Sequence, residues 1–403
     1  MRPDGLLDYG HRVPPSSAHP LNVTLCSALA QGGIAHYSHG LAGALQSMGI
    51  DTTVLMDGFP EFDLEGFPRS HRIVKELQLS ISRRTTVTSP FRNLYEMLKT
   101  TQKSQIIHFQ WSLGQRTDRL HWPVLHRLGK RIVYTAHDVL PHEPEIMSHE
   151  HCRWLYHRAD ALFVHGERMK ELLLGNFDVN PAVVHVIPHG NYNFISDAPS
   201  PWDRASARRS FGWDENDRVV LFFGLIRAYK GLDTLIEACR MVRDMGLAPG
   251  QRLRLVVAGR PFGNHWQEGR YEALIRDANL SSNVLLEFGH IDMKDIARIF
   301  HAADVVALPY KRGSQSGVLR LAYSFRKASV ATSVGSLAEV PQHDLTRFVP
   351  PEDPTQLALA LREILLDPEL ARSLGERGRH YADTDLGWDD IAKTTCAVYD
   401  SLT

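Results

Sequence analysis

Apolar runs of strand length alternate with segments of helical period along most of this 403-residue chain. A strand in a parallel sheet needs a crossover, usually a helix, before the next strand can join that sheet. The alternation therefore predicts parallel strands covered by helices, an α/β fold. In the first half the expected strands occupy 21–28, 51–56, 104–111, 131–138, 161–166 and 183–190.

The alternation runs through the chain twice. A polar, proline-containing stretch at 191–210 interrupts it, and a second series of strands begins at 218–224. We predict two doubly wound parallel-sheet domains, residues 1–195 and 216–385, joined by a linker at 196–215. Such sheets bind ligands beyond the carboxyl ends of their strands, so function is expected in the loops that face the cleft between the domains.

Composition excludes several classes of partner. Lys and Arg number 45 against 46 Asp and Glu, a balance with no overall attraction for nucleic acid. No apolar run approaches the ~20 residues that span a bilayer, and the first twenty residues lack the apolar segment of a signal peptide. The four cysteines are widely spaced, as in reduced cytosolic proteins. We expect a cytoplasmic protein and leave open a peripheral contact with the cytoplasmic face of the membrane.

Histidines are numerous, 21 in all, and crowd between His121 and His189. That segment has no HExxH and no paired Cys/His spacing, so we predict no metal site. Asp383 and Asp385 imitate the DxD of metal-dependent sugar transferases, but they lie in a helical tail and not after a strand. Neither a metal nor another cofactor is expected.

The strongest local signal is the loop FFGLIRAYKG at 222–231. A buried strand ends at Gly224, and Arg227 and Lys230 follow it before a helix begins near Gly231. The arginine fork and the lysine charge both suit phosphate oxygens, and a helix N-terminus adds free N–H groups. A solvated basic turn is the ordinary alternative, but the flanking glycines favour phosphate binding.

A second segment of this kind, GSQSGVLRLAYSF at 313–325, follows another expected strand. Ser314, Ser316 and Gly317 open a helix whose first N–H groups could cradle a diphosphate. A serine that merely caps the helix accounts for the pattern equally well.

Gly32 and Gly33 separate the first strand from its helix, where they would let a ligand approach the backbone closely. A tight turn explains them about as well. They do not form GxGxxG, which argues against a nicotinamide dehydrogenase. GxxxxGK[ST] and GxSxG are also absent from the sequence, which argues against a P-loop enzyme or a hydrolase elbow.

Histidines end two of the expected strands. His137 and Asp138 lie at the end of TAHD, where an imidazole could donate a hydrogen bond to a substrate hydroxyl or shuttle a proton. A capping aspartate beside a buried histidine is the alternative. His189 ends the last strand of the first domain similarly and ranks below His137.

From about Leu21 to the C-terminus, the chain resembles the retaining GT-B glycosyltransferases of the large family 4 / group 1 type, which includes bacterial hexosyl- and mannosyltransferases. FFGLIRAYKG is similar to that family's G-x-x-x-x-x-K-G donor-phosphate loop. Further similar blocks follow in the family's order at 255–260, 306–318, 330–340 and 348–361. GWDDIA at 387–392 resembles the start of the family's final helix, here 386–403, which often crosses back to the first domain.

The resemblance implies two Rossmann-like domains, an N-terminal acceptor domain and a C-terminal donor domain. It implies transfer of a hexose-type sugar from a UDP- or GDP-linked donor to a glycan or lipid-linked acceptor, without a metal. Arg227 and Lys230 would hold the diphosphate, and His137 would lie by the transferred sugar. The donor-binding set implied is Gly33, Gly224, Arg227, Lys230, Ser314, Ser316, Gly317 and Val318.

One departure bears on catalysis. The family usually carries two glutamates eight residues apart in the block at 313–322. Here Gly313 or Ser314 stands at the first place and Leu321 or Ala322 at the second. The donor-sugar contacts therefore do not carry over. Two alternatives stay open: a GT-B-like nucleotide-sugar epimerase or hydrolase, and a non-catalytic subunit that binds a nucleotide or a glycan.

Overall fold

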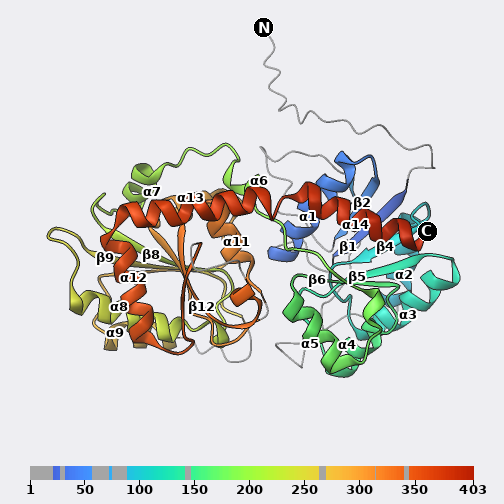
Figure 1. Ribbon diagram of the computed structural model, residues 1–403, viewed down its shortest axis with the longest axis horizontal. Helices are drawn as coiled ribbons and strands as arrows, with labels where there is room; N and C mark the ends of the chain where they lie inside the picture. Colours follow the sequence, from blue (N-terminus) through green and yellow to red (C-terminus); the bar gives the residue numbers. More distant parts are fainter. Residues whose placement is uncertain are drawn as a thin grey trace, which may run out of the picture.

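Two parallel sheets, one in each half of the chain, lie side by side (Figure 1). The computed structural model describes residues 21–27, 32–56, 72–74, 89–140, 147–262, 269–313, 315–339 and 345–403. The predicted α/β class and the two doubly wound sheets are confirmed.

The N-terminal sheet has seven strands within the described residues, in the order β3-β2-β1-β4-β5-β6-β7. They are β1 (Asn22–Ser27), β2 (Asp51–Met56), β3 (Arg72–Val74), β4 (Ile106–Phe109), β5 (Arg131–Thr135), β6 (Ala161–Val164) and β7 (Val184–Val186). The helices are α1 (Gly33–Ser47), α2 (Ser89–Thr100), α3 (Gln115–Arg127), α4 (His149–Tyr156), α5 (Glu167–Phe177) and the short turn η2 (Pro181–Val183). Each strand except the short β3 falls within a predicted run.

The C-terminal sheet has six strands within the described residues, in the order β10-β9-β8-β11-β12-β13. They are β8 (Arg218–Phe223), β9 (Leu253–Gly259), β10 (Val284–Phe288), β11 (Val305–Leu308), β12 (Ala328–Thr332) and β13 (Arg347–Val349). The helices are α8 (Leu232–Met245), α9 (Arg270–Asp277), α10 (Met293–Ala302), α11 (Gly317–Ser324), α12 (Pro354–Leu366) and α13 (Pro368–Thr384), with turns η3 (Ala228–Lys230) and η4 (Gly335–Glu339).

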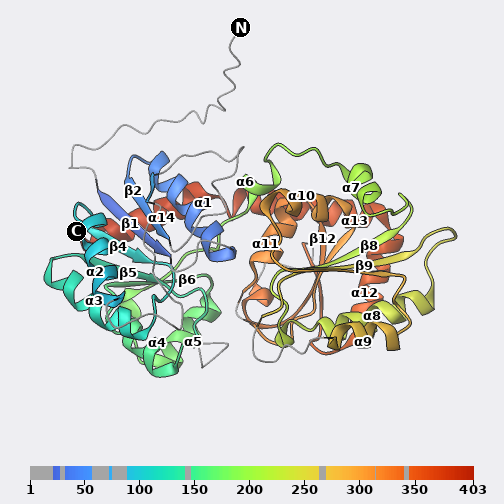
Figure 2. The ribbon, with the colours of Figure 1, turned by 180° about the vertical axis from the view of Figure 1, so that it is seen from behind.

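The segment between the two sheets is structured. It contains α6 (Asn193–Ser196) and α7 (Arg204–Ser210). α6 lies at the junction of the two halves, against α10 and α11 (Figure 2). The α7 helix begins at a capping box between Asp203 and Ser206, which supplies its first N–H groups with acceptors.

Each sheet is buried on both faces, which explains its apolar strands. Successive side chains of a strand point to opposite faces. In β1, Val23 and Leu25 join a core shared with α1, while Cys26 joins a separate core with α3 and α4. The core on the α1 side continues into the C-terminal half, where it includes Phe300 of α10 and Leu319 of α11.

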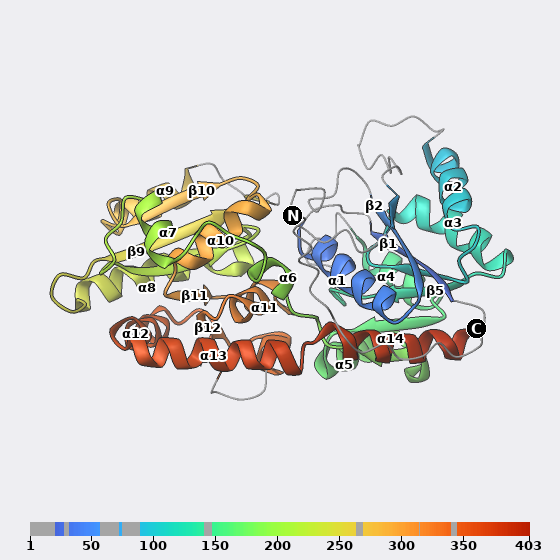
Figure 3. The ribbon, with the colours of Figure 1, turned by 90° about the horizontal axis from the view of Figure 1, so that it is seen from above.

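The last two helices run end to end along one side of both halves (Figure 3). α14 (Trp388–Leu402) packs on α1, and its Tyr399 hydroxyl lies 2.6 Å from Nδ1 of buried His108 in β4. The indole of Trp388 fits between two glycines, because a Cβ at Gly40 or Gly190 would lie 2.3 or 2.4 Å from its ring. The end of the described chain is therefore part of the N-terminal core.

Candidate functional site

Loops that follow strands in the two halves meet around one phenol. The Tyr192 hydroxyl donates a hydrogen bond to the Gly33 carbonyl over 3.5 Å. A Cβ at Gly33 would lie 3.7 Å from that hydroxyl, and a Cβ at Gly317 only 2.9 Å away. Gly33 begins α1 and Gly317 begins α11, so the predicted glycines of both halves adjoin the same point.

Lys230 is a buried cation of the C-terminal half, on the loop that follows β8. Its side chain is 9% exposed, and its ammonium lies 5.2 Å from the centre of the Tyr310 ring. Burial lowers the pKa of Lys230, while the charges of Tyr229 and Asp138 oppose that shift. Among the described residues no carboxylate forms an ion pair with it. A buried, charged amine without a counterion is costly, and an anionic ligand would remove that cost.

Glycines allow the loop around Lys230 to pack directly on the strands. Gly231 has φ of 71°, and a Cβ there would lie 1.9 Å from the Pro309 carbonyl oxygen. A Cβ at Gly259 would lie 1.8 Å from the Gly224 carbonyl oxygen. Neither position has room for a side chain, since these contacts are with backbone. The loop is thus held rigidly at the end of β8.

The remaining predicted donor residues of this half lie nearby. A Cβ at Gly224 would lie 3.3 Å from the Val318 side chain and 3.4 Å from Lys230 Nζ. Ser316 is the N-cap residue of α11, and its Oγ lies 3.0 Å from the Tyr310 hydroxyl. The structure thus places Gly224, Lys230, Ser316, Gly317 and Val318 together. Their role in binding stays a prediction.

Arg227 and Ser314 complete the predicted set. The Arg227 guanidinium stacks 4.5 Å from the centre of the Phe262 ring, which orients it on the same loop as Lys230. Ser314 lies outside the described residues. Gly32, with φ of 78°, precedes α1.

A cluster of buried histidines occupies the corresponding strand ends of the N-terminal half. His137, His165 and His189 follow β5, β6 and β7, and each is less than a tenth exposed. The Tyr37 ring contacts all three, with centroid distances between 4.9 and 5.2 Å. Burial lowers the pKa of His165 to about 4 and holds the pKa of His137 and His189 well below their ordinary range. The cluster is therefore neutral at neutral pH.

The hydrogen bonds fix the tautomers of this neutral cluster. His165 Nδ1 lies 3.0 Å from the Ile187 carbonyl oxygen, so it carries the proton. His165 Nε2 must then accept from His137 Nδ1, 3.0 Å away. That leaves His137 Nε2 as an acceptor beside the Gln110 amide, whose Nε2 is buried. Gln110 satisfies both groups when its amide nitrogen faces His137, since the two ends of an amide interchange on a half-turn.

This arrangement bears on the role predicted for His137. Both of its ring nitrogens are occupied by protein groups, His165 and Gln110. The buried-histidine alternative weighed from the sequence fits these contacts, and the predicted sugar contact stays a prediction. His189 donates from Nδ1 to the Gly190 carbonyl and lies 3.5 Å from the Tyr192 hydroxyl, so it borders the junction of the two halves.

Two carboxylates lie at the junction of the halves. Asp138, after β5, is close enough that its charge acts on Tyr229 and Lys230 of the C-terminal half. Glu339, in η4, accepts a hydrogen bond from the Arg168 backbone N–H in the first turn of α5. A Cβ at Gly166, the N-cap position of α5, would lie 2.1 Å from the Glu339 carboxylate. Glu339 thus caps a helix of the other half.

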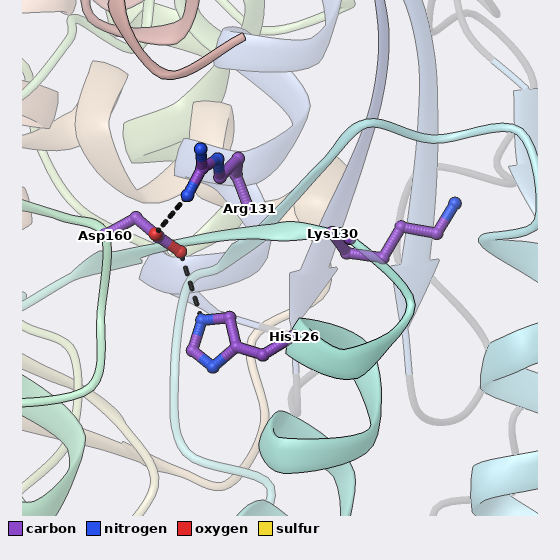
Figure 4. Close-up of a pocket in the computed structure, with 5 residues that line it drawn as sticks. His126, Lys130, Arg131 and Asp160 are labelled. Atoms are coloured by element: carbon purple, nitrogen blue, oxygen red, sulfur yellow. Dashed lines mark hydrogen bonds and ion pairs between the residues drawn. The ribbon is translucent and has the colours of Figure 1, made fainter.

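A surface pocket of about 500 Å³ lies elsewhere, at the amino-terminal ends of strands in the first sheet (Figure 4). Arg131 begins β5 and Asp160 precedes β6. The pocket therefore lies at the opposite ends of these strands from the histidine cluster. Asp160 bonds His126 and Arg131 over 3.1 and 3.2 Å, whereas Lys130 points away from them. Its charges are paired within the chain, and we do not place the functional site there.

Several residues at the junction escaped sequence reasoning. Tyr37, Gln110 and His165 complete the histidine cluster, and Tyr192 joins the halves. One signal could have found His165: histidines follow three strands that are consecutive in the sheet. Tyr37, in a helix, and Gln110, in a loop, carry no comparable pattern.

The described residues contain neither a metal-binding cluster nor a membrane-spanning helix. No group of three or more His, Cys, Asp and Glu is placed there to hold a metal ion. No helix among them is both long enough and apolar enough to cross a membrane.

Comparison with known proteins identifies the family. The sequence model described as "Glycosyl transferases group 1" matches residues 203–381, and that described as "Glycosyltransferase Family 4" matches residues 31–190. The chain belongs to the family 4 / group 1 glycosyltransferases, with the GT-B fold that the sequence predicted.

Particular relatives agree with this class. The chain is 30% identical, over 252 residues, to the "D-inositol 3-phosphate glycosyltransferase" of Kineococcus radiotolerans; the match covers 60% of this chain and 57% of that protein. The chain thus spans little more than half the length of that relative.

Solved structures share the fold. The sucrose-phosphate synthase of Thermosynechococcus elongatus superimposes with a TM-score of 0.72 at 22% identity, over 95% of this chain and 99% of that one. Anabaena HepE in complex with UDP-glucose gives a TM-score of 0.74 at 16% identity, over 94% and 100% of the two chains.

Proposed function

We propose that this chain transfers a hexose-type sugar from a nucleotide diphosphate sugar to a hydroxyl acceptor, with retention at the anomeric carbon and without a metal. The observation that carries the proposal is Lys230, a buried amine without an ion pair among the described residues, beside the first residues of α11. The UDP-glucose bound by Anabaena HepE supports a nucleotide-sugar donor.

In this proposal the C-terminal half stabilises the leaving group. Negative charge builds on the diphosphate as the glycosidic bond breaks, and Lys230 and Arg227 supply positive charge on a rigid loop. The free N–H groups that begin α11 add donors aimed at the same oxygens. Since these cations can neutralise the diphosphate, the proposal does not call for a divalent ion.

Retention follows from a front-face substitution. The acceptor hydroxyl attacks from the side on which the diphosphate departs, and its proton passes to the departing phosphate oxygen. The chain's own part is to hold donor and acceptor together and to exclude water at the junction of the halves. The neutral histidine cluster and Tyr37 would form the wall on the acceptor side.

The acceptor is proposed as a glycan or lipid-linked molecule, encountered in the cytoplasm or at the cytoplasmic face of the membrane. Relatives named for inositol 3-phosphate favour including a small phosphorylated polyol among the acceptors tested. The base of the donor is proposed as uracil or guanine.

The test is a panel of UDP- and GDP-sugars assayed for nucleoside diphosphate release in chelator, with and without a pool of lipid-linked, glycan and polyol acceptors. Release that needs both one donor and one acceptor, with an unchanged anomeric configuration by NMR, is the expected result. Release without acceptor would favour an epimerase or hydrolase. Nucleotide binding without any release would favour a non-catalytic subunit, consistent with the absent glutamates.

A further inference from the structure

Arg320 lies in α11, one turn beyond Gly317, on the face of the helix that meets the junction. Gly317, Arg320 and Ser324 recur at helical spacing and so share one side of α11. The other two both contact Tyr192: Gly317 adjoins its hydroxyl, and Ser324 Oγ accepts a hydrogen bond from its backbone N–H over 2.9 Å. Arg320 is thus directed to the boundary between the halves.

The guanidinium of Arg320 has no partner among the described residues. Its Nε and Nη1 atoms are buried and make no hydrogen bond, and within the described chain it forms no ion pair. The two described arginines whose side chains are buried as a whole, Arg208 and Arg379, are satisfied. Arg208 bonds three backbone carbonyls and Asp304, and Arg379 bonds Asp197, Asp383 and the Ser324 carbonyl. Because burying an unpaired cation is costly, Arg320 stands out as a group awaiting an anion.

The groups around Arg320 do not supply that anion. Its charge acts on His165 and His189 of the N-terminal half, on Tyr192, and on Tyr323 and Tyr381 of α11 and α13. All are imidazoles or phenols, which are uncharged at neutral pH here. The charges that act on Lys230 are different, those of Arg227, Tyr229 and Asp138. The chain therefore presents two separate cationic places at the junction.

We infer that Arg320 binds a carboxylate or phosphate group carried by the sugar or the acceptor, in addition to the diphosphate that Arg227 and Lys230 would hold. Arginine presents a planar fork of donors that pairs with such oxyanions through two parallel hydrogen bonds. The inference rests on the proposed function and narrows its substrate class. An acidic sugar and a phosphorylated acceptor offer the same chemistry from two sources.

The test compares matched ligands that differ by one anionic group. Four proteins are titrated by calorimetry with UDP, UDP-glucose and UDP-glucuronate. They are the wild type, Arg320→Gln, Arg320→Lys and the control Arg276→Gln, which changes an exposed arginine of α9. With UDP bound, the same variants are titrated with inositol and inositol 3-phosphate. If the wild type binds guanine nucleotides instead, GDP and a neutral and an acidic GDP-sugar replace UDP and the UDP-sugars. Thermal unfolding of each variant shows that it is folded.

We expect the wild type to bind the anionic member of one pair at least tenfold more tightly than its neutral partner. Arg320→Gln should abolish that preference while leaving UDP affinity within twofold. Arg320→Lys should keep part of the preference, and Arg276→Gln should keep all of it. A preference between the two nucleotide sugars would place the anion on the sugar. A preference between the two inositols would place it on the acceptor. The inference is overturned if the wild type shows no such preference, or if Arg320→Gln weakens UDP itself as much as every sugar. A wild type that binds no nucleotide contradicts the proposed function, and the inference with it.

Discussion

The two halves of this protein share a fold and differ in how they build their side of the junction. The C-terminal half concentrates charge on one short loop, with Arg227 and Lys230 three residues apart after β8. The N-terminal half gathers neutral rings from three strands and a helix, with Tyr37 at their centre. A charged leaving group needs the first kind of surface and a sugar or polyol suits the second. The difference suggests why a sequence motif marks the site in the C-terminal half, whereas no such motif marks it in the N-terminal half.

Removing the charge of Lys230 should produce the largest effect. In Lys230→Ala, turnover should fall by roughly 10²–10³-fold, the usual loss for one group that stabilises developing negative charge. Nucleoside diphosphate release at saturating donor measures it. Lys294→Ala, an exposed lysine of α10, is the matched control. Equal turnover in the two variants would mean that the charge asymmetry between the halves has no catalytic meaning.

Removing the indole that anchors α14 to the N-terminal half should come next. Trp388→Ala leaves a space between Gly40 and Gly190 and loses the hydrogen bond to the Asn191 carbonyl. Because Trp388 is half-buried, the unfolding free energy should fall by about 2–3 kcal/mol, below the range for fully buried tryptophans. Urea unfolding measures the loss, with Tyr95→Ala, an exposed aromatic of α2, as control. A loss no larger than that of the control would show that α14 is dispensable to the N-terminal core.

The neutral histidines predict a dependence of stability on pH. Their folded pKa values lie below the unfolded value near 6.5, so in mildly acidic solution the unfolded chain binds protons that the folded chain does not. Stability is fully present above that value and is lost as the pH falls toward about 4. Between pH 7 and pH 6 the loss should be about 0.7 kcal/mol for each such histidine.

Urea unfolding at the two pH values tests this sign and size. His165→Gln should make the dependence shallower, whereas His380→Gln, at an exposed position of α13, should leave it unchanged. Stability that stays level or rises between pH 7 and pH 6 would contradict a neutral cluster.

The smallest effect is expected at Glu339, a residue of the C-terminal half that caps helix α5 of the N-terminal half. Glu339→Ala removes the acceptor at the start of α5, which should cost about 1 kcal/mol or less. Because the contact spans the halves, it should broaden the interdomain distance distribution measured between spin labels more than it lowers the unfolding free energy. Glu352→Ala, an exposed glutamate of the same half, is the comparison. An unchanged distribution would show that the contact does not hold the halves together.

Sequence reasoning succeeded where a signal is local. The strand runs and the helices α1 and α8 could be anticipated, because alternation and loop glycines act over a few residues. The short strands β3 and β13 were missed because, unlike β7, neither lies in a longer apolar run of the sequence. Tyr192, Arg320 and the pairing of His137 with Gln110 were also missed. Their meaning depends on which distant segments pack together, which no local pattern states.

The position of α14 also has a consequence for the order in which the protein can form. Its Tyr399 and Trp388 complete the core around α1 and β4, although they are made long after those elements have left the ribosome. Domains usually fold in the order of synthesis. Here the first half can gain its strands early but must wait, with the α1 face uncovered, until the second half has been translated. That interval is when the nascent chain most needs protection from aggregation.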